Sequence, residues 1–140
     1  MKFLFTLLLV GLVQLSMAQT PKINEDSVYI RQHYTKMERM VPMRDGVKLF
    51  TSIYVPKDIA SGKKYPIMLN RTPYSVAPYG DTLYKTSLGP SMLFARDGYI
   101  FVYQDVRGKY MSEGSFEDYR PFITNKKNET DNDESSDAYD

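Results

Sequence analysis

Two polar stretches that follow apolar runs carry the side chains best suited to chemistry. Tyr74 stands directly behind Pro73 at the end of one run, and Asp105 and Arg107 follow another. A tyrosine at such a place usually packs against the core with its hydroxyl in water, and the residues alone favour that interpretation. For the carboxylate and guanidinium, the commoner arrangement is a buried ion pair that fixes a loop, so we expect a structural role for Asp105 and Arg107, with catalysis as the alternative.

His33 and the acidic residues near the C-terminus are weaker candidates for a catalytic or metal site. His33 is the only histidine of the chain and lies in a polar stretch with no serine in a nucleophile-elbow context, so we expect a surface residue rather than a general base. Acidic and hydroxyl side chains alternate near the C-terminus as in a calcium loop, at Asp131, Asp133, Ser135 and Asp137. The sixth position of that loop requires glycine and is Ser136 here, so we expect helix capping, no metal and no cofactor.

The first elements that position these residues are two alternating segments. Residues 36–43 and 47–55 flank an Arg-Asp-Gly turn at 44–46, which predicts an antiparallel β-hairpin with one face in water. In the second strand the core-facing residues are expected to be Val47, Leu49, Thr51, Ile53 and Val55. The water-facing residues are expected to be Lys48, Ser52 and Tyr54, with Phe50 as an exception.

Two continuous apolar runs, 65–70 and 99–103, are typical of strands buried on both faces. Residues 91–98 between them predict a short helix that ends at a glycine. This order is a βαβ unit, which pairs its two strands in parallel. The sequence therefore predicts an α/β fold with a mixed sheet, and both polar stretches leave the sheet at the edge where ligands bind in such folds.

The N-terminus predicts a signal peptide over residues 1–18. Lys2 is followed by an apolar run from Phe3 to Val13 and by Ser16-Met17-Ala18, the small-x-small order that precedes cleavage. The run is shorter than the roughly 20 residues that span a bilayer, so we expect export to the periplasm or the medium rather than a membrane anchor. Residues 19–36 are predicted to be a polar leader on the surface, and residues 37–140 a folded domain.

Composition narrows the classes of function. The 140 residues are 42% hydrophobic, which suits a folded domain, and include no cysteine, so no disulfide contributes to stability. Signal cleavage removes one basic residue, and the 18 basic and 17 acidic residues of the chain then balance to a formal charge of zero. We therefore expect neither a nucleic-acid nor a membrane partner. Nothing in the residues indicates an oligomeric state.

Four segments together resemble, in order and spacing, the N-terminal part of the X-Pro dipeptidyl-peptidase-like serine hydrolases. This group includes the cocaine esterases, the α-amino-acid ester hydrolases and the glutaryl cephalosporin acylases. The segments are MRDGVKLFT (43–51), PIMLNRTPY (66–74), GYIFVYQDVRGKYMSEG (98–114) and DESSDAYD (133–140). The resemblance covers about residues 38–140. It implies the N-terminal part of an α/β-hydrolase fold, truncated before the Gly-x-Ser-Tyr-x-Gly nucleophile elbow and before the Asp and His of the triad.

The resemblance also implies a role for Tyr74, because the tyrosine at this place in the family donates its hydroxyl to the oxyanion. The implied activity is hydrolysis of a small-molecule ester, an amide or a short peptide. Without the triad the 140 residues alone are expected to be inactive. The alternative is a noncatalytic binding or interaction module that keeps the strands and lacks the site.

Overall fold

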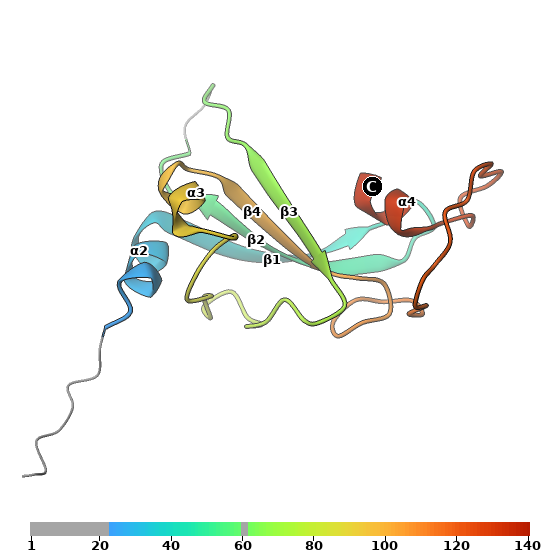
Figure 1. The fold of residues 1–140 in the computed structure, drawn as a ribbon, viewed down its shortest axis with the longest axis horizontal. Coiled ribbons are helices and arrows are strands. Elements are labelled where there is room, and N and C mark those ends of the chain that lie inside the picture. The colour runs from blue at the N-terminus through green and yellow to red at the C-terminus, as the bar shows by residue number, and fades with distance from the viewer. Residues whose placement is uncertain (1–22, 60–61) are drawn as a thin grey trace, which may run out of the picture.

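The structure, a computed structural model, describes residues 23–59 and 62–140 (Figure 1). The predicted signal peptide lies outside the described residues. Four strands form one sheet in the order β1-β2-β4-β3. The elements are α2 (Glu25–His33), β1 (Tyr34–Pro42), β2 (Lys48–Pro56), β3 (Ile67–Thr72), α3 (Met92–Arg96), β4 (Ile100–Asp105) and α4 (Glu134–Tyr139). Figure 1 shows α2 and α3 near one end of the sheet and α4 near the other.

The predicted hairpin is confirmed. Strands β1 and β2 pair antiparallel, from Tyr34 opposite Pro56 to Pro42 opposite Lys48. Gly46 has a φ of 83°, a left-handed conformation that glycine adopts without steric cost. The turn is closed by the hydrogen bond that Met43 N donates to Val47 O at 2.8 Å.

The predicted βαβ unit is confirmed as well. Strands β3 and β4 pair in parallel, from Ile67 opposite Ile100 to Thr72 opposite Asp105. The side chain of Ser91 caps the start of α3, and Gly98 follows the helix with a φ of 81°. Because β2 and β4 pair antiparallel, the sheet is mixed and the fold is α/β, as the sequence predicts.

The prediction that one face of β2 lies in water is wrong. Ser52 and Tyr54, expected to face outward, are 1% and 0% exposed. β2 lies between β1 and β4. Residues 84 and 85, in the segment between β3 and α3, cover the face on which Tyr54 lies. The Tyr54 hydroxyl accepts a hydrogen bond from Lys85 N at 3.0 Å, and its ring contacts that of Tyr84 edge to face.

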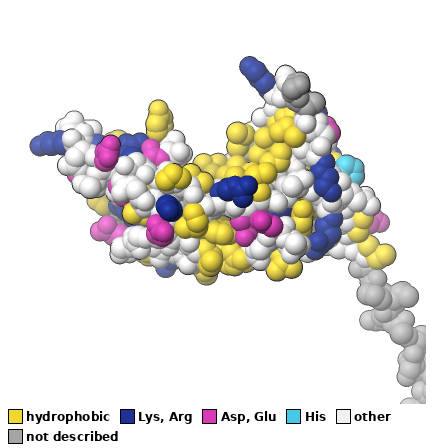
Figure 2. All heavy atoms as spheres, turned by 180° about the vertical axis from the view of Figure 1, so that it is seen from behind, with side chains coloured by type: hydrophobic (Ala, Val, Ile, Leu, Met, Phe, Trp, Pro, Cys, Tyr) yellow, Lys and Arg dark blue, Asp and Glu magenta, His cyan; other side chains and the backbone are white. Residues whose placement is uncertain are grey.

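The prediction that β3 is buried on both faces is also wrong for the described residues. Ile67 and Leu69 are 66% and 47% exposed. β3 stands last in the strand order and pairs only with β4 within the described part of the chain. Figure 2 shows hydrophobic side chains gathered across the middle of the side opposite to the view of Figure 1, with a few charged side chains among them. The continuous apolar run predicted the strand correctly but not its burial.

The core lies between the helices α2 and α3 and the face of the sheet that carries Tyr54 and Phe101. Its fully buried members are Ile30, Tyr34, Tyr54, Leu88, Ala95 and Phe101. Two of them, Ile30 and Tyr34, fall within the predicted polar leader. The described part of that leader, residues 23–36, therefore differs from the prediction, because it forms α2 and the start of β1. Ile30 and Tyr34 turn inward, whereas Ile23 and Val28 stay exposed. The Tyr34 hydroxyl donates to Ala95 O at 2.8 Å.

The acidic tail begins a helix, as the sequence predicts. Asp133 caps α4, its side chain accepts from Ser136 N at 2.9 Å, and the Ser136 side chain bonds back to Asp133 N. No helix in the described residues is long and apolar enough to cross a membrane.

Candidate functional site

The carboxyl ends of β3 and β4 form one edge of the sheet, and both polar stretches leave the strands there. Thr72 and Asp105 are opposite each other, and Val106 N donates to Thr72 O at 3.2 Å. This edge is called the rim below; it comprises residues 72–79 after β3 and residues 105–114 after β4. The structure therefore brings together the two stretches that the sequence singled out.

Tyr74 lies on the rim with 84% of its surface exposed. Its backbone N–H donates to Thr72 Oγ1 at 3.0 Å, which closes a short turn around Pro73. Pro73 fixes its own φ and restricts that of Thr72, so the direction in which the chain leaves β3 is set. The phenol consequently stands out from the strand end with its hydroxyl open to the solvent.

Asp105 is fully buried beneath the segment that follows Tyr74. Its Oδ1 accepts from Val76 N at 3.0 Å, and its Oδ2 accepts from the Tyr79 hydroxyl at 2.9 Å and from Met111 N at 3.4 Å. Burial raises the pKa of Tyr79, and the hydrogen bond to Asp105 adds to that increase while the bond with Ser75 opposes it. The expected ion pair with Arg107 is absent from the contacts of Asp105.

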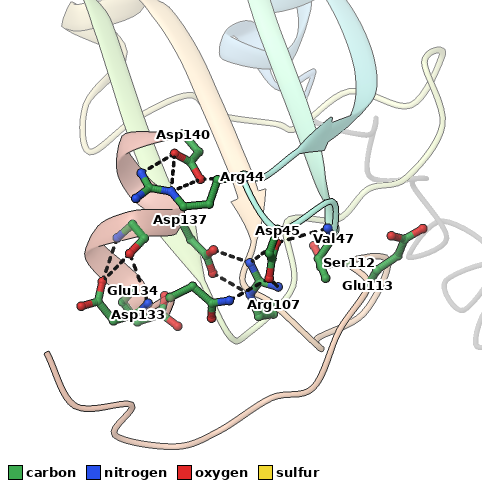
Figure 3. A network of polar contacts seen from close by, with 12 residues as sticks. Arg44, Asp45, Val47, Arg107, Ser112, Glu113, Asp133, Glu134, Asp137 and Asp140 are labelled. Carbon is green, nitrogen blue, oxygen red and sulfur yellow. Dashed lines mark hydrogen bonds and ion pairs between the residues drawn. The ribbon is translucent and has the colours of Figure 1, made fainter. Parts of the chain in front are cut away.

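Arg107 instead bridges two other carboxylates, as Figure 3 shows. It binds Asp137 through Nε at 3.0 Å and Nη2 at 2.6 Å, and Asp45 through Nη1 at 2.8 Å and Nη2 at 3.2 Å. The hydrogen bonds to Asp137 and then to Asp45 raise the pKa of Arg107, although burial acts in the opposite direction. The predicted Asp105–Arg107 pair is therefore wrong: each residue is buried at the rim, but each has different partners.

The loop after Arg107 is shaped by two glycines. Gly108 and Gly114 have φ values of 69° and 88°. A Cβ on Gly108 would overlap Phe116 N, and one on Gly114 would lie 2.8 Å from Arg107 Cγ. Glycine at both positions thus lets the loop pack closely against its own backbone and against the aliphatic part of the Arg107 side chain.

A polar ladder across three strands was not found by sequence reasoning. Arg71 Nε donates to Gln104 Oε1 at 2.7 Å, and Gln104 Nε2 donates to Thr51 Oγ1 at 3.1 Å. Arg71 also binds Glu134 of α4 through Nη1 at 3.0 Å. Only the strand register, which places Arg71 opposite Gln104 and Gln104 opposite Thr51, makes this ladder visible.

Helix α4 is attached to the sheet by charge rather than by apolar packing. Asp137 has 1% of its side chain exposed and lies between Arg107, Arg71 at 3.6 Å and Arg120 at 3.4 Å. At the end of the helix, Asp140 binds Arg44 at 2.6 Å. Of the other acidic residues that alternate in the tail, Asp133 caps α4 and pairs with Lys126 at 2.7 Å, and Asp131 accepts from Lys127 N at 2.8 Å. Within residues 23–59 and 62–140, no group of three or more His, Cys, Asp or Glu side chains is placed to hold a metal ion.

His33 lies at the end of α2, at the amino side of β1. Its Nδ1 donates to Tyr29 O at 2.9 Å, and its ring stacks on that of Tyr29 with centroids 4.0 Å apart. It is exposed and bonded within its own helix. This placement agrees with the surface role expected from the sequence.

The chain is similar to known hydrolases over most of its length. Residues 45–140 match the model of the family described as X-Pro dipeptidyl-peptidase (S15 family). Cocaine esterase from Rhodococcus sp. (strain MB1 Bresler) is 43% identical over 77 residues, which are 55% of this chain and 12% of that protein.

Two solved structures share the fold. An aminopeptidase from the marine sediment archaeon Thaumarchaeota archaeon is 38% identical with a TM-score of 0.60, over 87% of this chain and 19% of that one. An α-amino acid ester hydrolase is 37% identical with a TM-score of 0.60, over 89% of this chain and 20% of that one. The chain thus spans a fifth or less of the length of these relatives, and its mixed sheet is part of an α/β-hydrolase-type fold. It belongs to the X-Pro dipeptidyl-peptidase (S15) family of hydrolases.

Proposed function

We propose that this chain is the N-terminal segment of an exported serine hydrolase that cleaves esters or amides, and that Tyr74 is one donor of its oxyanion hole. The family and the names of the relatives support the reaction class: an esterase, an ester hydrolase and an aminopeptidase all transfer an acyl group to water. The substrate would be a small-molecule ester, an amide or a short peptide.

The exposed Tyr74 hydroxyl at the rim is the observation that carries this function. When a nucleophilic oxygen adds to a carbonyl carbon, the electrons of the C=O π bond move onto the carbonyl oxygen. A donor aimed at that oxygen stabilises the resulting anion, and it acts best when its direction is set beforehand. Pro73 restricts the backbone from which the phenol leaves the strand end, and the rim is where the active sites of open α/β sheets lie.

The remaining catalytic groups would come from polypeptide beyond residue 140. A serine nucleophile, a histidine base and an acid that orients the histidine are needed for acyl transfer. We therefore expect the 140 residues alone to hydrolyse neither a chromogenic ester nor a chromogenic amide above background. Turnover by the isolated chain would contradict this division of the site. A cooperatively folded chain whose gene encodes nothing further would support the binding-module alternative.

The test is Tyr74→Phe in the full-length protein encoded by the gene. We expect kcat to fall about 10²–10³-fold with little change in KM or in the unfolding midpoint, because the lost hydrogen bond forms chiefly in the transition state. Tyr65→Phe is the matched control. Tyr65 lies just before β3, at the end of that strand opposite to Tyr74. Its hydroxyl donates to Asp58 O at 2.8 Å. Equal kcat values for Tyr74→Phe and the unmodified enzyme would assign Tyr74 to the surface.

A further inference from the structure

The buried carboxylate of Asp105 binds the segment that follows Tyr74. Asp105 is 0% exposed and binds the backbone of Val76, two residues after Tyr74, at 3.0 Å. Its second oxygen binds the Tyr79 hydroxyl at 2.9 Å. Tyr79 in turn bonds Ser75 Oγ at 2.9 Å, so Asp105 reaches both residues that follow Tyr74.

The backbone between Tyr74 and Val76 requires such support. Ser75 has a φ of 77°, a left-handed conformation that is uncommon for any residue other than glycine or asparagine and persists only where surrounding contacts impose it. Ser75 Oγ accepts from Ala77 N at 3.1 Å, which closes the turn locally. The hydrogen bonds that connect Ser75 and Val76 to the end of β4 run through Asp105, directly from Val76 N and through the Tyr79 hydroxyl from Ser75.

We propose that Asp105 is a positioning residue for Tyr74. Its two oxygens hold the strained turn at Ser75, and the turn sets where the Tyr74 phenol projects from the rim. This positioning role rests on the oxyanion role proposed for Tyr74. A carboxylate suits it because both oxygens only accept, and the three groups that face them donate: two backbone N–H groups and one phenol.

The first test is Asp105→Asn in the full-length enzyme. An amide presents one acceptor and one donor, so it cannot accept from Val76 N, the Tyr79 hydroxyl and Met111 N in their present orientation. We expect kcat to fall about tenfold with KM unchanged, because a small displacement of a catalytic donor lowers the rate without removing substrate contacts. Amide hydrogen exchange at Val76 should accelerate, while exchange in the β2–β4 ladder stays the same.

The deciding measurement is a double-mutant cycle with Tyr74→Phe. If Asp105 acts through the Tyr74 hydroxyl, Asp105→Asn lowers kcat in the parent but causes no further loss in the Tyr74→Phe background. Equal losses in both backgrounds would overturn the positioning role and leave the oxyanion role intact. Unchanged kcat in Tyr74→Phe alone would overturn the oxyanion role, and the positioning role with it.

Tyr79→Phe is a second variant that keeps the fold. The Tyr79 ring packs edge to face on Phe50 with centroids 5.2 Å apart, and this contact survives the loss of the hydroxyl. We expect a smaller fall in kcat that also vanishes in the Tyr74→Phe background. Wild-type kcat in both Asp105→Asn and Tyr79→Phe would overturn the assignment.

Asp45→Asn is the matched control for loss of a buried carboxylate. Asp45 has 9% of its side chain exposed, and its carboxylate binds Arg107, Val47 N and Asn132 rather than the turn at Ser75. The control should lower the unfolding midpoint and leave kcat unchanged. A loss of kcat equal to that of Asp105→Asn would show that any damaged carboxylate at the sheet impairs turnover, and would count against a specific role for Asp105.

Discussion

Arg107 binds Asp137, thirty residues further along the chain, through two hydrogen bonds of 3.0 and 2.6 Å. Both side chains are almost fully buried, with 5% and 1% exposed. Asp45 in the β1–β2 turn supplies the second carboxylate. One guanidinium therefore joins the hairpin, the end of β4 and helix α4.

Arg107→Ala should lower the free energy of unfolding by about 3 kcal/mol, because it leaves the buried Asp45 without a cation and removes the shortest arginine contact of Asp137. Arg107→Lys should restore only part of that loss, since an ammonium cannot form the two bidentate contacts. Chemical denaturation of the chain measures both. Arg44→Ala is the control: the Arg44–Asp140 pair is more exposed, and its loss should lower stability much less than the loss of Arg107. An equally small effect of Arg107→Ala would mean that the bridge is not a major contact.

Acid should weaken the attachment of α4. The N–H of Ile123 and then Lys126 hold the pKa of Asp133 well below the ordinary value of 3.8. A carboxyl whose folded pKa is depressed contributes stability above its unfolded pKa, and that stability is lost as the pH falls below it. We expect the denaturation midpoint to change little from pH 7 to 5 and to fall below about pH 4.

Asp133→Asn tests this assignment, because asparagine still caps a helix but does not titrate. The variant should be less stable at neutral pH and should show a shallower decline in acid. A decline as steep as that of the parent would place the acid sensitivity elsewhere, for example at Asp140, whose pKa Arg44 also lowers.

The strands and caps were predictable because they depend on local pattern. Alternation and an Arg-Asp-Gly turn predicted the hairpin, and two apolar runs around a short helix predicted the parallel pair of strands. The acidic tail predicted the capped start of a helix for the same reason, and the structure places the cap at Asp133. The rim followed from parallel pairing alone, since parallel strands end at one edge.

The partners of charged residues were not predictable, because they depend on contacts between distant segments. Proximity in sequence suggested that Arg107 pairs with Asp105, but its partners are 62 and 30 residues away. Alternation likewise suggested that Tyr54 faces water, whereas a later segment covers it. A polarity pattern describes the strand on which a residue lies and contains no information about what packs on that strand afterwards.

If the protein is exported with cleavage of its signal peptide, the mature chain begins at one defined residue. If residues 1–18 are a signal peptide, the mature protein begins at Gln19 and is recovered outside the cytoplasm. N-terminal sequencing or intact mass of the recovered protein checks this. Ala18→Arg, which places a large charged residue at the cleavage position, should leave the signal attached. Recovery of the unmodified protein with Met1 retained would contradict export by this route.

Among the residues of β1, Lys36 should be the one whose substitution lowers the free energy of unfolding most. Its side chain is 0% exposed, and its Nζ donates to Glu38 Oε1 at 2.7 Å. It also lies 2.6 to 2.8 Å from three backbone carbonyls of the loop that follows Tyr74, those of Pro78, Gly80 and Leu83. One ammonium thus ties this loop to the hairpin. Lys36→Ala removes the cation from four inward-facing acceptors and should lower the free energy of unfolding by about 3–5 kcal/mol.

Chemical rescue separates the charge of Lys36 from its packing. Propylammonium restores an ammonium group and part of the side chain, so it should raise the denaturation midpoint of Lys36→Ala above that in tetramethylammonium at the same concentration and ionic strength. Tetramethylammonium has no N–H or O–H and cannot donate hydrogen bonds to the carbonyls. The unmodified chain should respond equally to the two cations. Lys36→Met, which keeps the volume and lacks the charge, should be as destabilised as Lys36→Ala if the acceptors dominate; near-normal stability of Lys36→Met would instead show that the side chain acts by filling space.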